Sequence, residues 1–319
     1  MNIKNFIKNN KILIIYFVIL AVLIIFFSKI QENFITVRNI KNLLRHTTRN
    51  AFAALGLTFV IIVGHNDLSF GLIGCLSAMT TSFMIALGQN AIVSIIIGLL
   101  IGAICGLLNG YIIARFKLPD IVVTIGSGAI AFGLSYLYSK GAFIYDNFLT
   151  SGILGINDIS ILGIPFPVIL LLIIFLVCFY FLNKTTIGRK FYATGENIIA
   201  ATYSGINVRT FIIAAFILSA SLGSLSTIIE TAFQGRGNVK TGMILLLPSY
   251  ATVYLGRAIF GKPTVNGSLI ASIFIAVILN GLTLMNMPFY VSNLILSIVL
   301  LIALILSKLS LSARRKKLG

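Results

Sequence analysis

The chain has 319 residues, of which 58% are hydrophobic and only 10% carry a charge, and its mean hydropathy is +1.06. A soluble domain carries charge on about a quarter of its residues, so this composition excludes an ordinary soluble globular protein. Apolar stretches of about 20 residues are long enough to cross the roughly 30 Å hydrocarbon layer of a bilayer. The sequence therefore predicts an all-α, polytopic membrane protein.

The formal charge of +17 comes from 24 Lys and Arg residues against seven acids. These basic residues lie in short clusters at the ends of apolar runs, which is typical of membrane topology rather than of nucleic-acid binding. We therefore expect membrane lipid as a partner and no nucleic acid. Cys75, Cys105 and Cys178 lie within apolar runs without metal-ligand spacing, so we expect no metal site and no cofactor.

The N-terminus carries three lysines before an apolar run, in the layout of a signal peptide. The run from Ile12 to Phe27 is long and lacks an Ala-x-Ala cleavage site, so we expect an uncleaved first span. In chain order, apolar runs separated by charge and glycine predict about ten membrane segments. They lie at about 12–28, 48–64, 70–88, 91–114, 120–138, 163–182, 209–232, 243–259, 265–285 and 289–307.

Placing the N-terminus in the cytoplasm puts sixteen of the 24 basic residues on the cytoplasmic side, which agrees with the positive-inside tendency and predicts that both termini are cytoplasmic. Residues 29–49 oppose this topology, because they would lie outside although they carry five basic residues. Apolar residues between these bases predict an interfacial amphipathic helix on the outer surface. The five are Lys29, Arg38, Lys41, Arg45 and Arg49.

Two predicted segments share a pattern that indicates an internal repeat. Leu108-Asn109-Gly110 ends the fourth segment and Leu279-Asn280-Gly281 ends the ninth, and a proline follows each. These segments run in opposite directions in the predicted topology, so the pattern favours inverted repeat halves of about 48–138 and 209–307. Glycines at four-residue spacing from Gly98 are interpreted as helix-packing positions.

A few polar residues in or beside the apolar runs are candidates for the transport path or its gate. Asp67, with Ser69 after it, is placed to cap the third segment, and a gating role is the alternative. Glu230 lies near the outer end of the seventh segment, where it would be either a functional buried acid or a residue at the headgroups. Asn109 and Asn280 can bond to a neighbouring helix or to a polar solute.

The chain has few of the side chains that usually carry out catalysis. It has seven acids and two histidines, and it contains no metalloprotease, nucleophile-elbow or paired-carboxylate motif. Residues 256–262 match the first seven positions of a phosphate-binding P-loop, but Pro263 replaces the Ser or Thr of the eighth position and no buried strand precedes the motif. We interpret this stretch as a cytoplasmic turn, and we expect no enzyme activity in this chain.

Residues 184–209 form a basic, polar interruption in the apolar sequence. Within it, Asn197 can cap the start of a helix and Gly205 can end it, which leaves about two helical turns. A helix this short is not stable alone in water. It therefore either rests on the membrane surface or docks into a partner.

Three stretches together resemble the membrane permease subunit of bacterial ABC importers for simple sugars, in the ribose, xylose and galactose branch, which is related more distantly to nucleoside and branched-chain amino acid permeases. They are Gly64 to Gly71, Leu107 to Pro119, and Thr186 to Arg189 leading into Gly195 to Ile206. The first stretch departs from the family's Gly-Gly-Ile-Asp-Leu-Ser-x-Gly, because His65 and Asn66 stand at its second and third positions.

The third stretch is the most specific of these likenesses. In similar permeases, Gly-x-Asn-x-x-Ala-Ala-x-x-x-Gly-Ile forms a cytoplasmic coupling helix that docks on the ATPase. The resemblance therefore implies docking at Gly195, Glu196, Asn197, Ala200, Ala201, Ser204, Gly205 and Ile206.

The resemblance implies that residues 1–319 form a single transmembrane permease domain in the bacterial cytoplasmic (inner) membrane. A second copy or a paralogue would complete the pore, cytoplasmic ATPase subunits would hydrolyse ATP, and an extracytoplasmic solute-binding protein would deliver a simple sugar such as ribose. Two alternatives stay open. One is a nucleoside-type ABC permease, and the other is an ion-coupled secondary transporter, which needs a buried acid or a broken-helix ion site at the membrane midplane.

Overall fold

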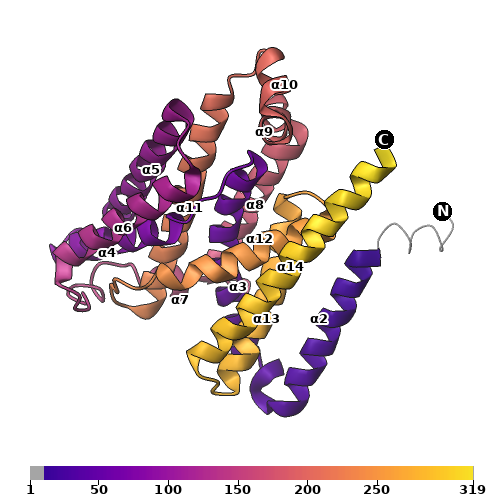
Figure 1. Cartoon of the computed structure of the whole chain (residues 1–319). Helices are drawn as coiled ribbons and strands as arrows, with labels where there is room; N and C mark the ends of the chain where they lie inside the picture. Colours follow the sequence, from indigo (N-terminus) through magenta and orange to yellow (C-terminus); the bar gives the residue numbers. More distant parts are fainter. Residues whose placement is uncertain (1–10, 319) are drawn as a thin grey trace.

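A computed structural model describes residues 11–318, and these residues are almost entirely helical (Figure 1). This confirms the predicted all-α class, with a two-strand hairpin, β1 (Ser160–Ile161) and β2 (Ile164–Pro165), as a minor addition. The remaining elements in chain order are α2 (Lys11–Ile30), η1 (Glu32–Ile35), α3 (Val37–Ile62), α4 (Phe70–Ala86), α5 (Ala91–Phe116), α6 (Asp120–Ser139), α7 (Gly155–Asp158), α8 (Phe166–Lys184), α9 (Thr186–Glu196), α10 (Ile198–Tyr203), α11 (Val208–Gln234), η2 (Met243–Leu245), α12 (Leu246–Phe260), α13 (Val265–Leu284) and α14 (Phe289–Leu318).

Within residues 11–318, eight helices are long and apolar enough to cross a membrane: α2, α5, α6, α8, α11, α12 together with η2, α13 and α14. Each of the ten predicted segments coincides with a helical element, but α3 and α4 are not among these eight. The helix α4 is apolar but has only 17 residues, and the first half of α3 is polar and basic. The predicted 163–182 segment begins slightly later, because the hairpin ends at Pro165 and α8 starts at Phe166.

The centre of the molecule is α11, which packs against α3, α4 and α5. The close approach of α5 to α11 depends on the predicted glycine stripe. A Cβ atom at Gly102 would clash with the Ser224 hydroxyl, and one at Gly106 would clash with the Phe216 carbonyl oxygen. The stripe is therefore a packing surface, as predicted, because a side chain there would push the two helices apart.

A second group of helices surrounds α12, which contacts α13, α14 and α3. The helix α13 is 67% buried over its apolar window, whereas α2 and α14 are each only 11% buried. Because α2 and α14 are hydrophobic on their exposed sides as well, they lie at the periphery, where lipid or another membrane chain can cover them. Figure 1 shows them together at one side of the bundle.

The prediction of a separate surface helix at residues 29–49 is wrong. A short 3₁₀ turn, η1, is followed by α3, which runs without a break from Val37 through the basic region into the apolar span. The side chains of Arg45 and Arg49 are partly buried rather than solvated. Arg45 donates a hydrogen bond to the Asn157 carbonyl oxygen at 3.0 Å, and Arg49 pairs with an acid of α11. Two of the five basic side chains that opposed the predicted topology therefore have partners inside the protein.

Different elements lie at the two ends of the bundle. The start of α2, the end of α14 and the short helix α10 lie at one end, which we call the α10 end (Figure 1). The turn between α13 and α14 and the 3₁₀ turn η1 lie at the opposite end.

Candidate coupling segment and polar sites

The short helix predicted around residue 200 is present with the predicted caps. Asn197 ends α9 and begins α10, and its Oδ1 atom accepts a hydrogen bond from the Ala200 N–H at 3.0 Å. At the other end Gly205 has a φ of +76°, and the Ile206 N–H donates to the Ala201 carbonyl oxygen at 3.0 Å. A left-handed glycine followed by such a backward bond is a common helix terminator. The segment is therefore a six-residue helix with both ends satisfied.

One side of α10 packs on the protein and the other side is free. Ala201 is buried, whereas Ile199 is 69% exposed and Tyr203 is 90% exposed. Residues four apart lie on the same face of a helix, so these two side chains form an apolar surface at the tip of the molecule. Of the remaining expected docking residues, Ile206 and Gly195 are partly buried and five are exposed: Glu196, Asn197, Ala200, Ser204 and Gly205.

Gly195 joins this segment tightly to the end of α3. A Cβ atom at Gly195 would clash with the carbonyl oxygen of Ile62, and the Gly195 Cα lies 3.6 Å from a Cβ built at Gly64. The preceding turn of α9 is anchored by Phe191, which is buried and stacks edge-on against Phe59 of α3 with ring centroids 5.7 Å apart. The junction of α9 and α10 therefore lies in direct contact with the start of the loop that follows α3.

The P-loop-like stretch lies beside α9 and is not a phosphate loop. Residues 256–260 form the last turn of α12, and Gly261 ends the helix with a φ of +72°. The Lys262 Nζ atom lies 4.8 Å from the centroid of the Tyr192 ring, and the Tyr192 hydroxyl donates to the Pro263 carbonyl oxygen at 3.2 Å. Burial raises the pKa of Tyr192 to about 12, so its hydroxyl stays protonated and can donate this bond. The predicted turn is therefore limited to Gly261 and Lys262, because residues 256–260 belong to the helix.

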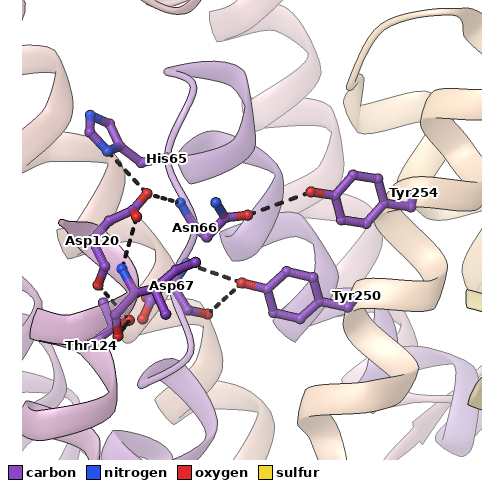
Figure 2. A network of polar contacts seen from close by, with 8 residues as sticks. His65, Asn66, Asp67, Asp120, Thr124, Tyr250 and Tyr254 are labelled. Atoms are coloured by element: carbon purple, nitrogen blue, oxygen red, sulfur yellow. Dashed lines mark hydrogen bonds and ion pairs between the residues drawn. The ribbon is translucent and has the colours of Figure 1, made fainter. Parts of the chain in front are cut away.

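The loop between α3 and α4 contains a fully buried carboxylate, Asp67, shown in Figure 2. Its Oδ1 atom accepts hydrogen bonds from the Ser69 N–H, at 2.9 Å, and from the Ser69 hydroxyl. Its Oδ2 atom accepts one from the Ser219 hydroxyl of α11 at 2.7 Å. The Asn109 side chain of α5 donates to the Ser69 hydroxyl at 2.9 Å. Three predicted site residues, Asp67, Ser69 and Asn109, thus meet in one network at the start of α4.

The same loop is held from two further directions by residues that the sequence patterns did not single out. The Asp120 carboxylate, at the start of α6, lies 3.2 Å from the His65 Nδ1 atom and accepts from the Asn66 N–H at 2.7 Å. The Tyr250 hydroxyl of α12 accepts from the Asp67 N–H and donates to the Asp67 carbonyl oxygen, each at 3.1 Å (Figure 2). An acid directly after a proline at a helix start was the available signal for Asp120; nothing in the local sequence marks Tyr250.

Glu230 is buried inside the protein. Only 9% of the residue is exposed, and its Oε1 atom lies 2.8 Å from a guanidinium nitrogen of Arg49 in α3. Gln234 donates to the same oxygen at 2.9 Å, and His46 lies 3.3 Å from the other end of the guanidinium group. The pair therefore fastens α3 to α11 close to the opposite end.

Asn280 lies away from the other candidates and is paired with Asn39. The two amide side chains exchange hydrogen bonds, each at 2.9 Å, and both residues are buried. Asn39 also donates to the Phe34 carbonyl oxygen. Asn280 thus connects α13 to the start of α3.

The opposite end contains a cavity of about 550 Å³ between α3, α12, α13 and α14. Its wall combines apolar residues with side chains able to bond hydroxyl groups, among them Arg49, Asn50, Thr283, Asn286, Ser292 and Asn293. Among the described residues, no group of three or more His, Cys, Asp or Glu side chains could hold a metal ion.

Comparison with known proteins places this fold in a family. Residues 39–304 match the family described as the permease component of branched-chain amino acid transport systems. The chain is 32% identical over 293 residues to the ribose import permease protein RbsC of Haemophilus influenzae and 33% identical over 291 residues to RbsC of Bacillus subtilis, covering at least 90% of each chain. It is 29% identical to the D-allose transport system permease protein AlsC of Escherichia coli over 92% of this chain. No solved structure matches.

These matches confirm the resemblance noted in the sequence and make the chain a transport subunit rather than an enzyme. The protein belongs to the family of multi-pass membrane permease components of ABC importers.

Proposed function

We propose that this chain forms the translocation path of an ATP-driven bacterial importer for a simple sugar such as ribose. Support for the substrate class comes from the relatives, which are named for ribose and D-allose import and align over about nine-tenths of the chain. Neutral amide and hydroxyl side chains in the cavity at the opposite end suit a polyhydroxyl solute, because they bond hydroxyls without burying a net charge.

The observation that carries the proposal is the capped helix α10. Its exposed Ile199 and Tyr203 side chains offer a small apolar surface on a helix whose ends are already satisfied, so the helix can dock as a formed unit. We assign this surface, with Glu196, Ala200 and Ser204 around it, to the cytoplasmic ATPase subunit. A second permease copy or a paralogue would complete the pore, and an extracytoplasmic solute-binding protein would dock at the opposite end.

This assignment makes the α10 end cytoplasmic and predicts cytoplasmic termini in the inner membrane. It also requires α3 and α4 to cross the bilayer, giving ten spans. A single cysteine introduced at Lys190, in α9, should then be labelled by a membrane-impermeant thiol reagent only after the cytoplasmic face is opened. One introduced at Tyr145, which is 69% exposed in the loop after α6, should be labelled in cells whose inner membrane is intact. The reverse pattern would contradict the topology.

We also propose that residues 48–138 and 209–307 are inverted repeat halves. The pairwise packing of helices supports this, because it is preserved when α3, α4, α5 and α6 are exchanged with α11, α12, α13 and α14. The contacts α4–α5, α4–α6, α5–α11 and α4–α11 have the counterparts α12–α13, α12–α14, α13–α3 and α12–α3. Asn109 and Asn280 occupy the corresponding helices α5 and α13.

The polar candidates divide into two proposed roles. Asp67, Ser69 and Asn109 would support a gate, because they hold the start of α4 to α5 and α11, and Gly195 contacts the beginning of the same α3–α4 loop. Glu230 and Asn280 would hold α3 in place near the outer cavity, since each pairs with a residue of that helix. ATP binding can then bias the permease between inward and outward states only if the ATPase binds α10 with unequal affinity in the two states.

The experiment is reconstitution of the purified complex in liposomes with its binding protein, followed by uptake of labelled ribose. The proposal predicts uptake that requires ATP and is insensitive to proton and sodium ionophores. ATP-dependent uptake of a nucleoside but not of ribose would show that the substrate is a nucleoside and not a sugar. Uptake driven by an ion gradient without ATP would support a secondary transporter. The variant Asn293→Leu tests the outer cavity: it should raise the half-saturating sugar concentration while leaving ATP hydrolysis intact, because Asn293 is exposed on the cavity wall.

A further inference from the structure

The last two turns of α12 and residues 304–308 of α14 form a groove of about 340 Å³ beside the turn that holds Lys262 against α9. Two cations, Arg257 and Lys308, line it together with the Tyr254 hydroxyl, the backbone region of Ser307 and two aliphatic side chains. The aliphatic pair is Leu304 and Ile305, which are 36% and 60% exposed on α14. The groove therefore has a cationic part and an apolar part.

Within the described residues, no ion pair neutralises the positive charge in this groove. No acidic residue lines the groove, and in the described part of the chain neither Arg257 nor Lys308 forms an ion pair. The Arg257 Nε atom is buried and has no hydrogen-bond partner. A partly buried guanidinium group without a counter-charge is stabilised when an anion approaches its exposed part. The sequence beyond Lys308 adds four more basic residues, Arg314 to Lys317, at the same helix end.

We propose that this groove binds an anionic phospholipid, with Arg257 and Lys308 contacting the headgroup phosphate and Leu304 and Ile305 contacting the adjoining carbons of the acyl chains. The groove lies where the apolar membrane-length parts of α12 and α14 end, at Phe260 and Lys308, so a lipid of the same leaflet reaches it without leaving the bilayer. A free phosphate ion would satisfy only the cationic part. A lipid satisfies both parts, and the assignment depends on the membrane location of the chain rather than on the transported sugar.

The test is native mass spectrometry of the purified chain in detergent, titrated with phosphatidylglycerol or with phosphatidylcholine. We expect the first phosphatidylglycerol molecule to bind more tightly than further phosphatidylglycerol molecules and more tightly than phosphatidylcholine. A basic residue near an anionic lipid surface contributes about fivefold to binding, so the double variant Arg257→Gln/Lys308→Gln should weaken that site about 30-fold. The control Lys184→Gln/Lys190→Gln removes two exposed charges at the same end, away from the groove, and should leave the site unchanged.

The single variant Lys308→Gln guards against a folding artefact, because Lys308 is exposed and its replacement should still weaken the site about fivefold. Wild-type affinity in both the single and the double variant would overturn the proposal. So would an equal loss in the Lys184 and Lys190 control, which would point to total charge instead of this groove. Displacement of the tight lipid by millimolar inorganic phosphate would show that the groove takes a free anion and would overturn the lipid assignment.

Discussion

Replacing Glu230 with Gln removes the acid that pairs with Arg49 and leaves the guanidinium group inside the protein without a counter-charge. The two side chains are 11% and 14% exposed and their charged atoms are 2.8 Å apart, so the pair is shielded from water on most sides. Breaking a buried ion pair by removing one partner costs about 3–5 kcal/mol of unfolding free energy. Because both groups keep a little solvent contact, we expect a loss of about 2–4 kcal/mol for Glu230→Gln.

The double variant Arg49→Met/Glu230→Met provides the contrast. It removes both charges and replaces them with flexible apolar side chains, and such replacements are often close to neutral. We therefore expect it to be more stable than Glu230→Gln alone, by about 2 kcal/mol. The matched control is Glu32→Gln, which removes an exposed acid that forms no ion pair within residues 11–318 and should change stability by less than about 0.5 kcal/mol.

The assay is reversible unfolding by SDS in mixed micelles, monitored by circular dichroism. It is applied to the wild type, the two single Met variants, their double variant, Glu230→Gln and the control. A double-mutant cycle across Arg49 and Glu230 should give a coupling energy of about 2 kcal/mol or more. Strictly additive losses would refute the reasoning, since they would mean that the two charges do not stabilise each other in the folded protein.

Three further changes test other contacts by the same assay. Ser219→Ala should cost about 1–2 kcal/mol, because the buried Asp67 carboxylate loses a donor, whereas Ser219→Thr should retain most of that stability; equal losses would contradict a hydrogen-bonding role. Asn280→Leu should cost about 1–3 kcal/mol, because the buried Asn39 Oδ1 atom loses its donor, and the added change Asn39→Leu should recover part of it; a further loss would contradict the pairing. Gly102→Val should reduce the yield of folded protein much more than Gly126→Val, since a Cβ at Gly126 meets open space; similar yields would contradict close packing of α5 on α11.

The helices and the capped segment could be predicted from the sequence because their causes are local. Apolar runs of membrane length lie in order along the chain, and each of the ten coincides with a helical element. The cap at Asn197 and the left-handed position at Gly205 depend only on neighbours within one turn. The spacing alone did not decide whether this segment rests on the membrane or docks into a partner. The resemblance to permeases implied that it docks on an ATPase.

The partners of the polar residues could not be predicted, because they come from distant parts of the chain. Asp67 and Ser219 are separated by 152 positions, and Asn39 and Asn280 by 241. Local pattern says that such groups need partners but not which ones. The basic region 29–49 was mispredicted for the same reason: its local pattern predicted an interfacial amphipathic helix, whereas it continues into α3 and tertiary packing supplies Arg49 with an acid from another helix.

The central claim is that α10 couples this permease to an ATPase, and the most direct measurement is copurification of the ATPase with tagged chain variants, with ATP hydrolysis measured on the isolated complex. The variants Ile199→Asp/Tyr203→Asp and Ala200→Arg change only exposed side chains. Gly205→Arg is less suitable, because it would also strain a backbone position with a φ of +76°. The matched control is Tyr145→Asp, an exposed tyrosine in the loop after α6. We predict that the α10 variants insert and fold normally but retain less than about a tenth of the bound ATPase, as expected when apolar contact residues are lost. Retention of the ATPase at the level of the Tyr145→Asp control would contradict the assignment.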